Sequence, residues 1–259
     1  MANNATTVWR WQGGDEAGNG WSVNETTPGH GNWLNGAGVP VSDYPTGSLA
    51  THTVKFLGAD LLNATSRCDT GPAAPVTLLK IEADTAYATT DGPSVCFANC
   101  TVGTVETMAD YDDPGHDNEA WVGIVAGAVT TAKCHGGTRI TGGTIGTLKM
   151  YDWAILYGAT ITSGIVLASG HPYIGVGTGN AVIFSNDATI DVRTVECNIS
   201  QEAGATGISF GGLSTDEVTM RFQRREGKID LSGLTIITGH LIIDASRAYG
   251  FGGGGLFPL

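Results

Sequence analysis

Short runs of alternating apolar and polar residues recur along this chain from residue 51 onward. Alternation with a period of two, rich in Thr, Val and Ile, predicts β-strands, and the Gly, Asn or Asp after each run predicts turns. Segments with helical periodicity are nearly absent, so the pattern predicts an all-β protein. The runs are Thr51–Phe56, Val76–Ile81, Thr138–Thr141, Ala159–Thr162, Ala188–Val192, Gly207–Phe210 and Lys228–Leu231.

The strands are expected to form coils rather than hairpins. The hairpin dipeptides Asn-Gly and Asp-Gly occur only at Asn35-Gly36 and Asp91-Gly92. Apolar anchors recur every 18 to 26 residues, and the segment 137–143 aligns with 158–164. This spacing predicts a right-handed parallel β-helix in which each strand pairs with its copy on the next coil, with a jelly roll or sandwich as the alternative. The anchors are Val54, Val76, Val102, Val122, Ile140, Ile161, Ile183, Ile208 and Ile229. Six of them are expected to point inward and to stack on successive coils: Val102, Ile140, Ile161, Ile183, Ile208 and Ile229.

The two ends of the chain differ in composition from the middle. Four of the six tryptophans, Trp9, Trp11, Trp21 and Trp33, lie in the first 50 residues among Gly and Asn. Large aromatic side chains bury much area per residue, which suits a cap over the exposed end of a solenoid. We therefore expect a cap or attachment segment at 1–50, a parallel β-helix at 51–248 and a Gly-rich tail at 249–259.

The first segment carries a resemblance. Trp11-Gln12-Gly13-Gly14, Gly20-Trp21, Asn32-Trp33 and Val39-Pro40, followed by the first strand run, look like the N-terminal cap of parallel β-helix proteins. Such caps belong to bacteriophage structural proteins of the Gly/Thr-rich type and to bacterial surface or autotransporter-type repeats. The resemblance covers roughly residues 7–57, with a longer insert at 22–30. It implies a β-helix fold and a place in the virion.

Charge and composition narrow the function classes. A net charge of −12 on 259 residues disfavours a nucleic-acid partner, which needs a basic face. Hydrophobic residues make up 41%, enough for a core. We expect neither a membrane span, since no apolar run approaches about 18 residues, nor a secretion signal at Met1–Ala5.

The five cysteines are odd in number and form no Cys-x-x-Cys motif, which argues against a zinc or redox motif. We interpret them as small buried apolar residues, with one or two disulfides as the alternative; Cys96 and Cys100 could pair across a turn. The set is Cys68, Cys96, Cys100, Cys134 and Cys197.

No coherent catalytic set is recognisable, and no cofactor or metal is expected. The acidic segment 110–119 is dense in oxygen ligands that suit Ca²⁺, but a solvated loop is the preferred interpretation. Asp152, Asp191 and Glu196 are isolated carboxylates that the fold could bring together, as glycoside hydrolysis requires. The run Gly175–Gly179 imitates a dinucleotide loop but is interpreted as a turn. His171 and His240 lack partners at metal spacing and are interpreted as ordinary histidines.

Assembly contacts are expected instead. The C-terminal tail ends in an apolar hook, and four basic residues gather within eight positions of an acidic chain; a disordered tail and a solvated face are the alternatives. The candidate contacts are Arg221, Arg224, Arg225, Lys228, Leu256, Phe257 and Leu259.

The sequence and the resemblance together predict a non-enzymatic virion protein of a bacteriophage. Its expected role is capsid decoration as a homotrimer bound to other virion proteins such as the major capsid protein, without nucleic acid or membrane. The alternative is a tail fibre, tailspike or adhesin that binds or cleaves host polysaccharide. Ice binding would require a Thr-x-Thr ladder on every coil, and the sequence has it only on some.

Overall fold

The computed structural model describes residues 7–13, 20–22, 31–62, 67–84, 94–108, 122–185, 187–194, 196–222, 228–231 and 235–244. At residues 94, 108, 122, 123, 196 and 228–230 it describes the backbone alone. The Ca²⁺ candidate segment 110–119 and the tail 249–259 lie outside the described residues.

The protein is all-β, as predicted. In the described ranges the only helical element is a short 3₁₀ turn, η1 (Gly58–Asp60). The strands join in one sheet. They are β1 (Val8–Trp11), β2 (Trp33–Asn35), β3 (Pro40–Val41), β4 (Gly47–Phe56), β5 (Val76–Asp84), β6 (Ser94–Cys96), β7 (Cys100–Met108), β8 (Val122–Cys134), β9 (Thr138–Tyr151), β10 (Ile155–Leu156), β11 (Ala159–Ser169), β12 (Tyr173–Val176), β13 (Ala181–Phe184), β14 (Thr189–Val192), β15 (Glu196–Gln201), β16 (Gly207–Phe210), β17 (Glu217–Phe222), β18 (Lys228–Asp230) and β19 (Ile236–Asp244).

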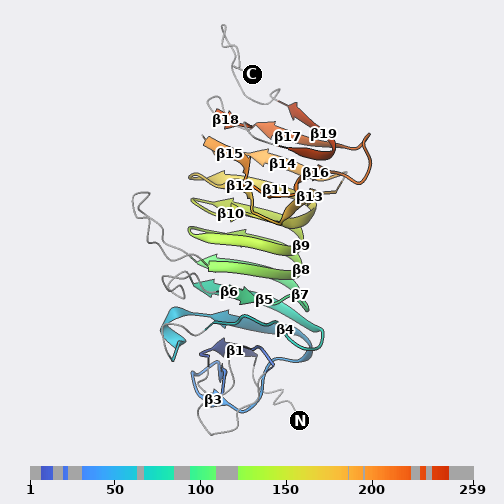
Figure 1. The fold of residues 1–259 in the computed structure, drawn as a ribbon. Helices are drawn as coiled ribbons and strands as arrows, with labels where there is room; N and C mark the ends of the chain where they lie inside the picture. Colours follow the sequence, from blue (N-terminus) through green and yellow to red (C-terminus); the bar gives the residue numbers. More distant parts are fainter. Residues whose placement is uncertain are drawn as a thin grey trace.

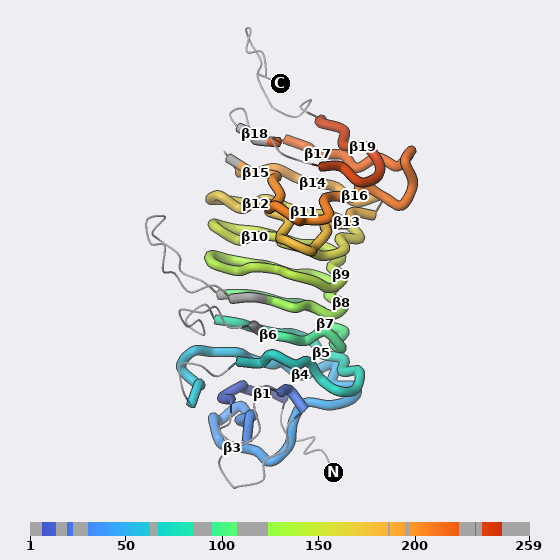
Figure 2. Tube along the Cα trace, viewed as in Figure 1, coloured from blue at the N-terminus to red at the C-terminus, as the bar shows by residue number. Residues whose placement is uncertain are grey.

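The strands lie one above another in a long, mostly parallel, solenoid-like stack (Figure 1, Figure 2). Each strand pairs with a strand of the next coil, as in the series β9–β10–β12–β15–β18. Among the described pairs only β1–β2 and β2–β3 are antiparallel. All described pairs between residues 130 and 240 are parallel, which contradicts the antiparallel pairing of a jelly roll.

Long strands bend where glycines allow two coils to approach closely. The first part of β11 pairs with β13 and its second part with β14, and Gly164 is the first paired residue of the second part. A Cβ atom on Gly164 would lie 2.6 Å from the carbonyl oxygen of Thr189 on the next coil. Gly143 on β9 has a φ of +91°, and a Cβ there would lie 2.4 Å from the carbonyl oxygen of Ala126. These glycines therefore set where one long strand divides into two faces.

The core consists of columns of apolar side chains in register from coil to coil. One column runs the whole length of the stack, and every member except the last is at most 2% exposed. Side chains stacked in this way exclude water along the axis of the solenoid, which provides most of the stabilising apolar burial. The column is Trp9, Val54, Ile81, Val105, Ala132, Leu148, Ile165, Ile190, Met220 and Ile243.

The anchors whose side chains are described are buried with one exception. Ile140, Ile161 and Ile208 belong to three different columns, so the prediction that the anchors stack on one another on successive coils is wrong. Burial is confirmed for Val102, Ile140, Ile161 and Ile208, and Val54 and Val76 are buried as well; the side chains of Val122 and Ile229 lie outside the described residues. The prediction for Ile183 is wrong: it is 41% exposed. Its neighbours Val182 and Phe184 face inward instead, because alternation in a strand sends every second residue outward.

The alignment of 137–143 with 158–164 does not correspond to the structural register. It paired Ile140 with Ile161, but Ile161 stacks on Ile145, and Ile140 stacks on Leu156. Both true partners are nearer in sequence than the alignment implied, so this coil is shorter than the predicted period.

The four tryptophans of the first segment are buried, as predicted, at the N-terminal end of the stack. Trp11, Trp21 and Trp33 are fully buried, and Trp9 is 2% exposed. The Trp33 ring meets those of Trp11 and Trp21 edge to face, with centroids 5.2 and 4.9 Å apart, and all three surround Phe56. The indole N–H of Trp33 donates to the carbonyl of Trp21, and that of Trp21 donates to the carbonyl of Pro45.

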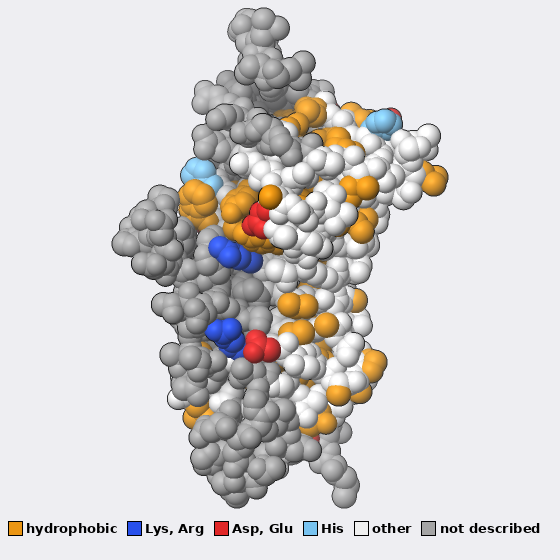
Figure 3. Space-filling model, viewed as in Figure 1, with side chains coloured by type: hydrophobic (Ala, Val, Ile, Leu, Met, Phe, Trp, Pro, Cys, Tyr) orange, Lys and Arg blue, Asp and Glu red, His pale blue; other side chains and the backbone are white. Residues whose placement is uncertain are grey.

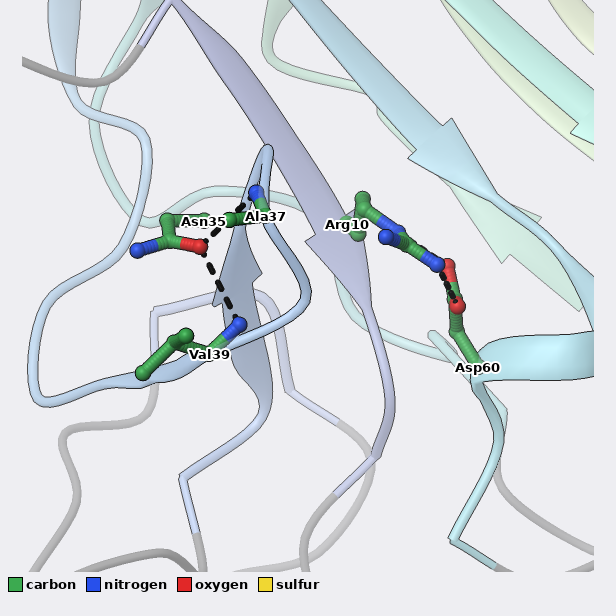
Figure 4. Close-up of polar contacts among 5 residues, drawn as sticks. All are labelled: Arg10, Asn35, Ala37, Val39 and Asp60. Carbon is green, nitrogen blue, oxygen red and sulfur yellow. Dashed lines mark hydrogen bonds and ion pairs between the residues drawn. The ribbon is translucent and has the colours of Figure 1, made fainter.

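Hydrogen bonds and an ion pair stabilise the tryptophan-containing N-terminal segment against the first coils (Figure 4). The Asn35 side-chain oxygen accepts hydrogen bonds from the backbone N–H groups of Ala37 and Val39, which shapes the turn between β2 and β3 at the Asn-Gly signal. The Arg10 guanidinium on β1 forms a two-point ion pair with Asp60 in η1. Strand β4 continues across residue 50, the predicted boundary between the cap and the β-helix, and its second half pairs in parallel with β1. The division into a cap, a helix and a tail remains a prediction.

A charged row follows the outer surface of the first coils. The Lys80 ammonium lies 2.8 Å from a carboxylate oxygen of Glu82 and 2.7 Å from one of Glu106, and Lys55 and Lys133 extend the row on either side. The hydrogen bond from Lys80 lowers the pKa of Glu106 below its usual 4.5.

This row predicts a stability term that disappears in acid. Because the folded state lowers the pKa of Glu106, its contribution is present above pH 4.5 and is lost as the pH falls through the folded value. The side chains are partly exposed, so we expect less than about 1 kcal/mol. Unfolding free energies of wild type and Glu106→Gln should differ at pH 7 and converge as the pH falls below 4.5 through the lowered pKa of Glu106. A difference independent of pH would contradict this assignment.

Candidate functional site: an open end and an aromatic shelf

The structure describes only part of the predicted assembly contacts. Arg224, Arg225, Leu256, Phe257 and Leu259 lie outside the described residues, and Lys228 begins β18 with its backbone alone described.

Arg221, on β17, is the one predicted contact whose side chain is described. It lies in register between Asp191 on β14 and Asp244 on β19. Acidic neighbours on both sides reduce its excess charge, which fits a solvated face better than a basic docking patch.

The C-terminal end of the described stack is apolar and open. The side chains of Ile236, Leu241 and Ile243 on β19 stack over the buried Ile208, Val218 and Met220 of the coil below. Ile236 is 45% exposed and Ile243 46%, whereas the three residues beneath them are fully buried. We call Ile236, Ile237, Ile242 and Ile243 the open-end isoleucines; all four are between 40% and 46% exposed.

This end contrasts with the opposite one, where the tryptophans complete the core. β1 and β3 lie at one extreme of the stack, and β17 and β19 lie at the other (Figure 1). Covering the open-end isoleucines would contribute a few kcal/mol at about 25 cal/mol per Å² of apolar surface. The sequence analysis placed its apolar contact at residues 256–259 and missed β19, although the isoleucine pairs at 236–237 and 242–243 were visible in the sequence.

A second surface lies on the outer side of β9, β10, β12 and β15. Two side-chain stacks from successive coils meet there: Trp153 on His171, with ring centroids 4.7 Å apart, and Arg139 over the Tyr157 ring, with the guanidinium carbon 5.5 Å from its centroid. Figure 3 shows hydrophobic, basic, acidic and histidine side chains close together on this level of the stack. We call the surface the aromatic shelf and define it by Arg139, Trp153, Tyr157, His171, Tyr173 and Glu202.

Glycines make room for the two tyrosine rings of the shelf. A Cβ atom on Gly175 would lie 2.8 Å from the Tyr173 ring, and one on Gly177 would lie 2.4 Å from the Tyr157 ring. The run 175–179 is therefore the floor beneath two phenol rings, with its turn at Thr178 and Gly179. Sequence reasoning identified the turn but not this role, because Tyr157 and Gly177 belong to different coils.

The polar groups of the shelf hold one another in place. Glu202 accepts hydrogen bonds on one carboxylate oxygen from the backbone N–H and the hydroxyl of Thr178, at 3.0 and 3.2 Å. Burial raises the pKa of the Tyr157 hydroxyl, and its hydrogen bond to Glu202 adds to the shift. Burial likewise raises the pKa of Tyr173 to about 12. Both phenols therefore stay protonated near neutral pH, and the Tyr157 hydroxyl donates to Glu202.

A groove and a column of threonines are the remaining candidate sites. A groove of about 400 Å³ follows the bend of β7, β8, β9 and β11 and is lined largely by threonine. One outward column beside it contains Thr77, Thr101, Thr144 and Thr160 but is interrupted by Ala128 and Ile183. An ice-binding ladder would need the unbroken series.

The isolated carboxylates Asp152 and Asp191 lie on separate elements, as do the two histidines. Asp152 lies in the turn after β9, Asp191 lies on β14 beside Arg193, and the side chain of Glu196 lies outside the described residues. His240 lies on β19, far along the chain from His171 of the shelf. Within the described part of the chain, no group of three or more His, Cys, Asp or Glu side chains is placed to hold a metal ion.

The cysteines behave as small apolar residues. All five are buried and free in the structure, so the disulfide alternative is not realised there. Burial raises the pKa of Cys134 to about 12 and that of Cys197 to about 11, which keeps both as thiols. The described residues also contain no helix that is long and apolar enough to cross a membrane.

Comparisons with known proteins give no relative to reason from. No family model, no curated protein and no solved structure matches this chain. Any functional assignment therefore rests on the two surfaces described above.

Proposed function

We propose that this protein is a non-catalytic structural component of a bacteriophage virion, with capsid decoration as its role. In this proposal the coils wind as a right-handed parallel β-helix, the hand favoured for parallel strand connections. The support is the stacked parallel architecture together with the likeness of the N-terminal segment, up to the end of β4, to β-helix caps. The protein acts by binding a neighbouring subunit of the particle.

The exposed isoleucines at the open end of the stack are the single observation from which we infer attachment to the particle. On the terminal strand, Ile236 and Ile243 are 45% and 46% exposed and stack directly on the fully buried Ile208 and Met220, and the neighbouring Ile237 and Ile242 are exposed as well. Contiguous exposed apolar side chains on a folded protein mark an interaction surface, because leaving them in water is unfavourable. The rigid stack then projects from the particle with its tryptophan-closed end outward.

A homotrimer is the proposed assembly state. Outward columns of threonine and of exposed apolar side chains such as Ile183 and Leu79 give flat faces that three copies could bury around a symmetry axis. The predicted tail contacts Leu256, Phe257 and Leu259 and the predicted basic contacts Arg224, Arg225 and Lys228 would add to the same attachment, and several weak contacts per trimer give avid binding.

The test uses the full chain with two changes at the open end. Ile236→Asp together with Ile243→Asp should abolish co-sedimentation with purified particles, while circular dichroism and the melting temperature stay close to wild type. Val39→Asp, at a residue that is 53% exposed beside β3 at the opposite end of the stack, serves as the control and should co-sediment normally. Deletion of residues 250–259 should weaken attachment without unfolding the stack.

Two results would overturn the proposal. One is absence of the protein from purified particles by mass spectrometry. The other is co-sedimentation of the Ile236→Asp, Ile243→Asp variant at wild-type levels.

A further inference from the structure

We propose that the aromatic shelf is a carbohydrate-binding site that takes an uncharged chain of pyranose sugars. This site is separate from the open end and does not depend on particle attachment. It would give the protein an affinity for a glycan surface, independent of the contacts that attach the protein to a particle.

The shape of the shelf suits sugar rings. The Trp153 and His171 rings are nearly parallel, with 16° between their planes, and come from adjacent coils. Tyr157 and Tyr173 pack against the glycine floor and are only partly buried. A pyranose has an apolar face of C–H groups that packs on an aromatic ring in the way other apolar groups do. Aromatic side chains with one apolar face and one polar tip therefore match both parts of a sugar.

The polar rim of the shelf suits sugar hydroxyls. A guanidinium carries its N–H donors in a fixed plane, and the Arg139 group is held against Tyr157 with its Nε buried, so the donors that face a ligand are on its terminal nitrogens. The Glu202 carboxylate is fixed by Thr178 and by the Tyr157 hydroxyl, and its oxygens carry further lone pairs that can accept. The Tyr157 hydroxyl, which donates to Glu202, adds an acceptor, and the Tyr173 hydroxyl adds a group that can donate and accept. Donors and acceptors held in place before binding lower the entropy cost of recognising a flexible hydroxylated ligand.

Charge selects an uncharged ligand. Arg139 and Glu202 carry opposite charges on the same shelf, so the site itself is close to neutral. The chain as a whole carries a net charge of −12, which repels polyanions at long range. An acidic polysaccharide or a nucleic acid is therefore disfavoured relative to a neutral glycan.

The dimensions allow more than one sugar ring. The shelf extends over the strands β9, β10, β12 and β15, which are successive neighbours in the stack. With about 4.8 Å between neighbouring strands, its length along the stack is roughly 14 Å. A single pyranose ring covers only part of this length, so an oligosaccharide should bind more tightly than a monosaccharide.

The experiment is calorimetric titration of the full-length protein with defined sugars. The probes are cellohexaose, maltohexaose, laminarihexaose, mannohexaose and chitohexaose, with hexagalacturonate as the acidic counterpart. We expect at least one neutral hexasaccharide to bind, the corresponding monosaccharide to bind more weakly, and hexagalacturonate not to bind. Trp153→Ala and Tyr173→Ala should each weaken binding by about tenfold or more, because each removes a stacking ring.

Matched variants separate binding from folding. Tyr173→Phe keeps the ring and its packing over Gly175, so it should retain most of the affinity. Tyr151→Ala removes another stacked tyrosine, whose ring lies 4.2 Å from that of His135 outside the shelf, and should bind like wild type. The proposal is overturned if no neutral hexasaccharide binds, if hexagalacturonate binds best, or if Trp153→Ala and Tyr173→Ala both bind like wild type while folded. The open-end variant Ile236→Asp, Ile243→Asp should bind sugar normally, so loss of particle attachment and loss of sugar binding are distinguishable.

Discussion

Replacement of Ile161 by Asp should lower the free energy of unfolding by at least about 3 kcal/mol. Ile161 is fully buried between Ile145 on the coil before it and Phe184 on the coil after it. A carboxylate there has no water and no described partner along the column, so it must lose its hydration or open the stack. Chemical denaturation followed by circular dichroism measures the loss.

The control for this prediction is Ile183→Asp. The same change is made on an adjacent coil, but the side chain is 41% exposed and lies in register with Thr160 on the outer surface. We expect a loss of less than about 1 kcal/mol. Equal losses at the two positions would contradict the described register, since they would mean that both side chains face the same environment.

Replacement of Trp33 by Ala should cost about 3–5 kcal/mol, the range for a large aromatic side chain removed from a packed core. The Trp33 ring is fully buried between Trp11 and Trp21, and its N–H donates to the Trp21 carbonyl. The remaining tryptophans should then show red-shifted fluorescence, because water reaches the end of the stack.

Trp153→Ala is the matched control, at a tryptophan that is only partly buried. We expect about 1 kcal/mol for it. A Trp33→Ala protein with wild-type stability and unchanged emission would show that the tryptophan cluster does not close the core.

The fold class could be predicted because strand signals are local. β-branched residues alternating with polar ones, punctuated by glycine, predict strands without knowledge of their partners, and the lack of hairpin signals favoured parallel coils. The exact register could not be predicted, because the members of one column are unevenly spaced along the chain. Ile190 and Met220 are neighbours in the long column just as Ala132 and Leu148 are, yet the first pair is separated by almost twice as much chain. With coils of such unequal length, a single average period assigned Ile183 to the wrong side of its strand.

The candidate sites were harder to predict from the sequence than the fold. The aromatic shelf joins residues of four neighbouring strands, and nothing near Tyr157 in sequence indicates Glu202. The open end became visible only when β19 was placed on top of a finished layer, since Ile243 has the same apolar character as the buried members of its column. The run 175–179 did carry a signal, because glycines at alternate positions of a strand indicate that something packs closely on that face.

The unequal ends of the stack also bear on how the chain folds during synthesis. The tryptophan-closed end is made first, and it gives the second half of β4 a finished apolar surface on which to settle. Each later coil then needs only the coil before it, so the growing chain acquires order in the direction of translation rather than waiting for its last residues. At every stage the unpaired strand edges of the last folded coil provide the hydrogen-bonding partners for the strands of the next coil. In the described residues, β19 is the strand that no later coil covers.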